Sequence, residues 1–164
     1  MVRSATILLL VAAVTPACAV PSSSPASPSS TADSSTHYQA EVAFCVEETN
    51  RYRASVGLPA VTRSATLETY AIEAARADAR ARTPHHHART TNHGNGTARA
   101  ENEILWWPLS TYKSVRNVIA GGLEDMWKQG ADGAHYRNLV GPYTEVGCGI
   151  FVQGDEVTVV QAFR

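Results

Sequence analysis

The C-terminal part of the chain alternates between apolar and other residues with a period of two. One such run covers residues 146–152 and a second covers residues 157–163, with the turn-forming residues 153–155 between them. Two alternating runs joined by a short turn predict a β-hairpin. Within the first run, Gly147 and Gly149 leave one strand face without side chains. We therefore expect another element to pack closely against that face.

Three amphipathic helices are expected before this hairpin. The first covers residues 38–54, the second begins after Ser64 and runs to about position 82, and Ser110 is expected to cap the third. Residues 83–98 are rich in Pro, Gly, Asn and His and predict an exposed loop, whereas residues 99–105 predict a short strand. This order of elements predicts an α+β fold, specifically a three-layer α-β-α sandwich with a small central antiparallel sheet.

The N-terminal part has the pattern of an exported protein. Residues 1–19 combine Arg3, an apolar stretch and small residues, and so predict a signal peptide. Residues 20–36 are rich in Ser and Pro and predict a disordered tether before a single domain at residues 37–164. Two outcomes stay open: cleavage after position 19, which secretes the protein, or lipidation of Cys18, which anchors it at the cell envelope.

The three cysteines fit the same compartment. Cys18 is removed with the signal peptide or carries the lipid, which leaves Cys45 and Cys148 as a pair. In an oxidising compartment the two can form a disulfide. They can equally remain two small buried side chains, since each lies on an apolar face of its expected helix or strand.

The charge pattern limits the classes of partner. The formal net charge is −1, with acidic and basic residues interspersed, which argues against nucleic acid or an anionic membrane as a partner. Membrane association is expected only through a lipid on Cys18. We expect a monomer whose partner is a small apolar ligand or a component of the cell envelope. The sequence has no nucleophile elbow, glycine-rich phosphate loop or His-Glu-x-x-His helix.

Four segments resemble one known family. They are Asn50-Arg51-Tyr52-Arg53 with Gly57-Leu58-Pro59, residues 67–77, Ala100-Glu101-Asn102, and His135-Tyr136 with Gly147-Cys148-Gly149. On these segments, which span nearly all of residues 37–164, the chain resembles the CAP superfamily of cysteine-rich secretory proteins, antigen 5 and pathogenesis-related class 1 proteins, in its bacterial form. The third segment departs from the family's Gly-Glu-Asn by having alanine at its first position.

The resemblance implies a cleft lined by two histidines and two acidic residues. It maps one of each onto His135 and Glu101, types that bind a divalent cation such as Zn²⁺. The second histidine is expected among those before Glu101, with His87 preferred and His93 as the alternative. From the residues alone, His135 and Glu101 can also be purely structural groups that hydrogen-bond to backbone.

The second acidic position departs from the family pattern. Where a glutamate is expected after Trp127, the chain has Gln129, an amide that carries no charge. Glu124 is a substitute earlier on the same expected helix. The site is therefore expected to hold a cation more weakly than the full set of four.

Three functions follow from the resemblance. We expect an exported protein whose His/Glu cleft binds a divalent cation and a ligand, without a catalytic role being implied. One alternative is a metal-assisted hydrolase with Glu101 as the base. The other is a module for lipid, sterol or cell-wall material that uses the apolar surface near Trp106 and Trp107.

Overall fold

The computed structural model describes residues 37–164; the expected signal peptide, tether and Cys18 lie outside the described residues. The described helices are α2 (Gln39–Ser55), α3 (Ala65–Ala81), α4 (His86–Gly96), α5 (Leu109–Tyr112), α6 (Val115–Lys128) and α7 (Ala134–Leu139). The described strands are β1 (Thr62–Arg63), β2 (Ala100–Pro108), β3 (Glu145–Gln153) and β4 (Glu156–Phe163). All three expected helices and the hairpin are confirmed.

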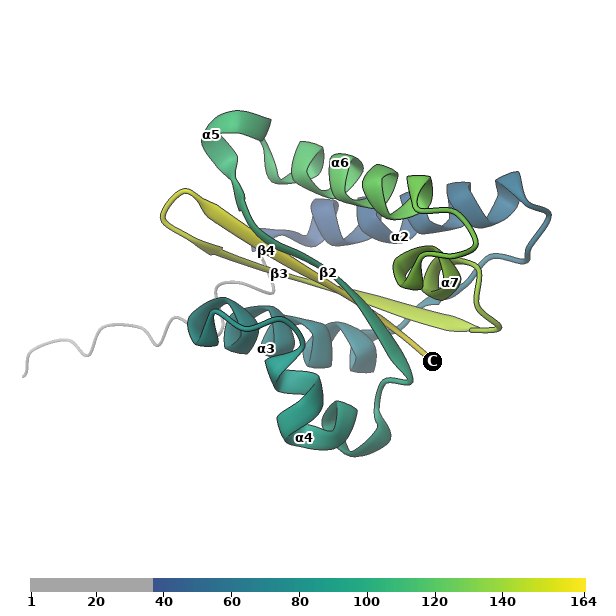
Figure 1. Ribbon diagram of the computed structural model, residues 1–164, viewed down its shortest axis with the longest axis horizontal. Helices are drawn as coiled ribbons and strands as arrows, with labels where there is room; N and C mark the ends of the chain where they lie inside the picture. Colours follow the sequence, from purple (N-terminus) through teal and green to yellow (C-terminus); the bar gives the residue numbers. More distant parts are fainter. Residues whose placement is uncertain (1–36) are drawn as a thin grey trace, which may run out of the picture.

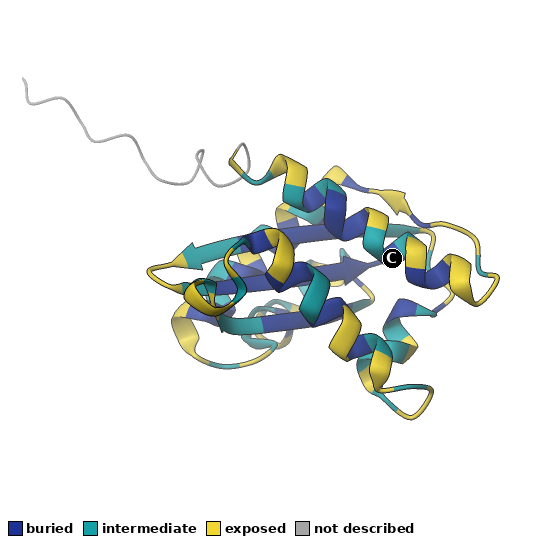
Figure 2. Cartoon of the chain, turned by 90° about the horizontal axis from the view of Figure 1, so that it is seen from above, coloured by how far each residue is buried: buried dark blue, intermediate teal, exposed yellow. Residues whose placement is uncertain are grey.

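The sheet lies between two layers of helices, as the predicted sandwich requires (Figure 1). Its strand order is β1-β3-β4-β2. The β2–β4 and β3–β4 pairs are antiparallel, and the two residues of β1 pair with β3 in parallel, so the sheet is mixed rather than wholly antiparallel. Helix α3 covers one face, while α2, α6 and α7 lie on the other (Figure 1). The strands are buried and the outer sides of the helices are exposed (Figure 2).

The bare strand face predicted from Gly147 and Gly149 is where α3 packs. A Cβ atom at Gly149 would overlap backbone atoms of Ala71 and Ile72, and one at Gly147 would overlap the backbone at Leu67. The alanines of α3 meet β4 on this face, in a small apolar core with Val160 and Ala162. The helix backbone thus lies directly on the strand backbone, which fixes α3 relative to β2 and β4.

A disulfide joins α2 to the sheet. Cys45 of α2 and Cys148 of β3 are bonded across a sequence separation of 103 residues, and both are almost fully buried in the larger core, between the sheet and α2 and α6. The sequence left open whether Cys45 and Cys148 form a disulfide or remain two separate buried side chains. In the structure they form the disulfide.

Loss of this disulfide is expected to lower the free energy of unfolding by about 2–5 kcal/mol. The reason is that the unfolded chain regains the conformational entropy of the loop between Cys45 and Cys148, which are 103 residues apart. The comparison is urea unfolding of a Cys18→Ser background, which has no third thiol, with and without the added change Cys45→Ala/Cys148→Ala. Equal unfolding midpoints would contradict the expectation.

The predicted loop at residues 83–98 is wrong, because most of it is the helix α4. Two acidic side chains from other elements accept the first free N–H groups: Glu103 accepts from His85, and Asp78 accepts from His87 at 2.6 Å. These carboxylates accept hydrogen bonds from the free N–H groups at the start of the helix, as the side chain of an N-cap residue would. Residues 92–95 then form a left-handed turn, with φ between 50° and 63°.

The start of the third helix also differs from the prediction. The cap of α6 is Ser114, whose side chain accepts from the N–H of Asn117. Ser110 lies instead in the short helix α5, where its N–H and hydroxyl both donate to Asp155 in the turn of the hairpin. That contact across the sheet is invisible in the local sequence.

Candidate functional site

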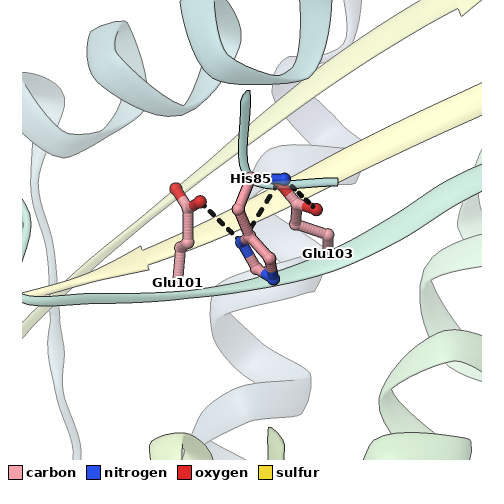
Figure 3. Close-up of side chains that lie close together, drawn as sticks. All are labelled: His85, Glu101 and Glu103. Atoms are coloured by element: carbon pink, nitrogen blue, oxygen red, sulfur yellow. Dashed lines mark hydrogen bonds and ion pairs between the residues drawn. The ribbon is translucent and has the colours of Figure 1, made fainter. Parts of the chain in front are cut away.

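Three side chains from β2 and the start of α4 meet in one cluster. Glu101 and Glu103 are two residues apart on β2 and so lie on the same face of the strand. His85 precedes α4, and its Nδ1 lies 2.7 Å from Oε1 of Glu101 and 3.5 Å from Oε1 of Glu103. Figure 3 shows this ring nitrogen facing both carboxylates while the other ring nitrogen points away from them.

Glu103 also holds the backbone from which His85 projects. Its two oxygens accept from the N–H of His85 at 3.2 and 3.0 Å. His85 has a left-handed backbone, with φ of 54°, an uncommon conformation for a residue other than glycine. The ring of His85 contacts Glu101 and its backbone N–H contacts Glu103, and both glutamates belong to β2. Tertiary contacts therefore position the imidazole.

Glu101 is oriented by a tyrosine from the opposite side. The hydroxyl of Tyr70, on α3, donates to Oε2 of Glu101 at 2.9 Å. Burial, followed by the nearby charge of Glu101, raises the pKa of Tyr70, so the hydroxyl keeps its proton and remains a donor. One oxygen of Glu101 therefore faces Tyr70 and the other faces His85.

Glu103 lies in a buried acidic environment. Burial, together with the neighbouring carboxyls of Asp78 and Glu101, raises the pKa of Glu103 to about 9. Oδ2 of Asp78 is buried and has no hydrogen-bond partner among the described residues. A protonated Glu103 would supply a donor beside this carboxylate. Burial and the neighbouring carboxyls therefore favour the protonated form of Glu103.

His135 approaches the cluster from α7. Its Nδ1 lies 2.8 Å from Nε2 and 3.2 Å from Oε1 of Gln129, an arrangement in which the amide orients the imidazole. Burial, followed by the charge of His85, lowers the pKa of His135. Its ring is therefore neutral near pH 7, which is the form that binds a metal.

A buried hydrogen-bond network holds α7 against β2. The side-chain amide of Asn102 donates to the backbone carbonyl of His135 and to Gln161. Asn138 in turn donates to Oδ1 of Asn102 and to the backbone carbonyl of Glu101. These bonds set the position of His135 relative to Glu101, since they join the backbone beside each residue.

Several residues singled out from the sequence lie away from this cluster. The histidine beside Glu101 is His85, whereas His87 points its ring against Tyr70, with ring centroids 5.2 Å apart. His93 lies in the left-handed turn and its Nδ1 has no partner among the described residues. Glu124 is exposed and pairs with Lys128 on the same helix at 2.6 Å.

Glu103 is the site residue that sequence reasoning missed. Its signal was present, because Glu101-x-Glu103 on an expected strand places two carboxylates on one face. With Gln129 in the position where an acidic residue was expected, Glu103 restores a second carboxylate near the histidines. Together with His85 and Glu101 it forms a group whose potential ligand atoms lie within 4.8 Å of one another.

A small cavity opens beside the cluster. It has a volume of about 140 Å³. Its lining combines the polar residues Glu103, Asp125, Gln129 and His135 with the apolar residues Ile104, Trp107 and Met126. Trp107 also stacks on Tyr112, whereas Trp106 lies under Arg82. The two tryptophans therefore belong to separate contacts.

The family assignment follows from a match over most of the chain. The family model described as the cysteine-rich secretory protein family, CAP, matches residues 46–163. The chain belongs to this family. The match includes Glu101, Glu103 and His135, so the cluster lies inside the family domain. No curated protein matches the chain significantly.

Solved structures with the same fold come from bacterial proteins. An outer surface protein from Borrelia burgdorferi is 16% identical, with a TM-score of 0.51, over 77% of this chain and 94% of that chain. An extracellular protein containing a SCP domain from Bacillus anthracis is 13% identical, with a TM-score of 0.51, over 85% of this chain and 45% of that chain. A cysteine-rich secretory protein from Staphylococcus aureus is 17% identical, with a TM-score of 0.49, over 76% of this chain and 38% of that chain. The two likenesses with a TM-score of 0.51 concern the fold alone.

Between residues 37 and 164, no helix combines enough length and apolar character to cross a bilayer.

Proposed function

We propose that this CAP-domain protein is exported and binds a divalent cation between β2 and the start of α4, with Zn²⁺ as the first ion to test. The observation that carries this is the group His85, Glu101 and Glu103, whose potential ligand atoms lie within 4.8 Å of one another. Imidazole and carboxylate are common zinc ligands, and three of them leave a further position for water or a ligand. His135 lines the cavity that Glu103 also lines.

The surrounding contacts support a pre-arranged site. Tyr70 orients Glu101, and Gln129 orients His135. Partners of this kind fix ligands in other metal sites, and their loss typically weakens metal binding about 10–100-fold. The raised pKa of Glu103 supports the same proposal, because closely packed carboxylates that favour a proton also favour a cation.

Calorimetric titration of the full chain with Zn²⁺ is expected to give one ion per chain. Glu101→Gln keeps the shape of the side chain but removes its charge, and should weaken binding by about tenfold or more. His85→Ala should have at least as large an effect. His86→Ala is the matched control, because His86 is the next residue along and is no part of the cluster. Equal affinities in Glu101→Gln, His85→Ala and the unaltered protein would refute the proposed site.

The cavity beside His135 supports a ligand as a second component. Its mixed apolar and polar lining suits a compact apolar group attached to a polar one that reaches the cation.

A further inference from the structure

A second and larger cavity lies outside the cation cluster. It is a groove of about 530 Å³ between α3 and α4. Helix α4 packs on α3 on the side away from the sheet (Figure 1). The groove is lined by Thr66, Thr69, Tyr70, Glu73, His87, Thr91, Gly94, Asn95 and Thr97.

The lining has an unusual composition. Five of the nine lining residues carry a hydroxyl and one carries an amide, no lysine or arginine lines the groove, and no aliphatic side chain larger than threonine does so. The lack of large aliphatic side chains disfavours a lipid chain, and the lack of lysine and arginine disfavours a phosphorylated or otherwise anionic ligand. The chemistry that fits is an uncharged ligand with many hydrogen-bonding groups.

Four polar groups around the groove are available to such a ligand. Within the described chain, no hydrogen bond is made by the side chains of Thr66, Glu73 and Asn95 or by the ring nitrogens of His87. Other groups are already used: the hydroxyl of Thr91, for example, donates to the backbone carbonyl of His87 at 2.7 Å. The free groups include donors and acceptors, as recognition of sugar hydroxyls requires.

The walls of the groove are held in place. The ring of His87 packs against that of Tyr70, which is itself 4% exposed and bonded to Glu101. The left-handed turn closes one side, and Gly94 is required there because a Cβ atom would lie 2.7 Å from Cδ2 of Tyr70. A groove formed before its ligand arrives loses less entropy on binding.

We propose that this groove binds a neutral saccharide. Sugar rings carry hydroxyls that match Thr66, Glu73 and Asn95, and their C–H faces pack on a flat ring such as that of His87. The volume lies within the range of about 300–1,000 Å³ that is usual for small-ligand sites. The proposal is independent of the cation site, although Tyr70 lies between the two.

The test uses three neutral probes: cellotetraose, maltotetraose and chitotetraose. Each is titrated into the full chain in the presence of a chelator, so that the cation site is empty, and binding is followed by NMR chemical-shift changes. We expect saturable binding of at least one probe, with shifts at the lining residues. His87→Ala and Glu73→Ala should each weaken it about 3–10-fold, the equivalent of one hydrogen bond.

Thr90→Ala is the control for these variants. Thr90 lies on the exposed side of α4, where its hydroxyl donates to the backbone carbonyls of His86 and His87, so binding should not change. Two outcomes would overturn the proposal. One is no saturable binding of any probe up to about 10 mM, a Kd weaker than any useful affinity. The other is binding that His135→Ala abolishes but His87→Ala and Glu73→Ala leave intact, since this would place the sugar in the cleft.

Discussion

Replacing Arg53 with methionine is expected to lower the free energy of unfolding by about 4 kcal/mol, because two buried carbonyl groups lose their donor. Arg53 is 1% exposed. Its Nη1 donates to the backbone carbonyls of Leu139 and Gly141, each at 2.9 Å, and its Nε donates to that of Pro59 at 2.9 Å. Methionine fills similar space but has no donor.

The position of Arg53 explains why the effect should be large. Burial lowers the pKa of Arg53, yet a guanidinium keeps its charge, and within residues 37–164 its hydrogen bonds go to backbone carbonyls. Two of these carbonyls, of Leu139 and Gly141, lie at the end of α7 and in the connection from α7 to β3. Arg53 therefore ties α2 to the connection that follows His135 and Asn138.

Urea unfolding followed by circular dichroism measures this effect. Arg51→Met is the matched control on the same helix, since Arg51 is exposed, pairs with Glu48 at 2.7 Å and lies over the ring of Tyr52. Exposed contacts of these kinds are each worth about 0–1 kcal/mol. If both variants unfolded at the same urea concentration, the buried hydrogen bonds of Arg53 would not have the stabilising role assigned to them.

Gly149→Ala is expected to be almost as destabilising, at about 3 kcal/mol or more, because overpacking here meets backbone instead of a movable side chain. The added Cβ would overlap Ala71 and Ile72, so α3 must move away from the sheet. Since α3 carries Tyr70 and Asp78, the same variant should also weaken binding of Zn²⁺. Thermal unfolding and the calorimetric titration test the two parts separately.

Gly121→Ala provides the comparison. A Cβ there would meet only side chains, the nearest being Trp107 at 3.2 Å and Tyr112 at 3.3 Å. Alanine also favours the helix by about 1 kcal/mol over glycine, so the net change should be small. Similar losses of stability in Gly149→Ala and Gly121→Ala would show that the contact between α3 and β3 is more adaptable than its geometry indicates.

The elements of the fold were largely predictable because their signals are local. Alternation over residues 146–152 and 157–163 gave the hairpin, and helical spacing gave α2, α3 and α6. Helix α4 was missed because its signals are not local. Its apolar residues do not recur at helical spacing, and its first turn is capped by Asp78 and Glu103, which lie elsewhere in the chain.

The candidate site was predictable only in part. Resemblance to the family singled out Glu101 and His135, and the structure brings both to one region. The choice among the clustered histidines depended on which one reaches β2, and this is His85 because Glu103 holds its backbone N–H. Neighbouring histidines have the same chemistry, so no local pattern distinguishes them.

The sequence by itself determined the periodic elements, the close approach at Gly147 and Gly149, and the family to which the domain belongs, because each depends on residue types at short or characteristic spacing. Only the tertiary structure decided that Cys45 and Cys148 are bonded, that Glu103 joins Glu101, and that His87 faces a groove instead of the cation cluster. The physical reason is that these outcomes depend on distances between segments far apart in the chain. Such distances are set by packing of the whole domain.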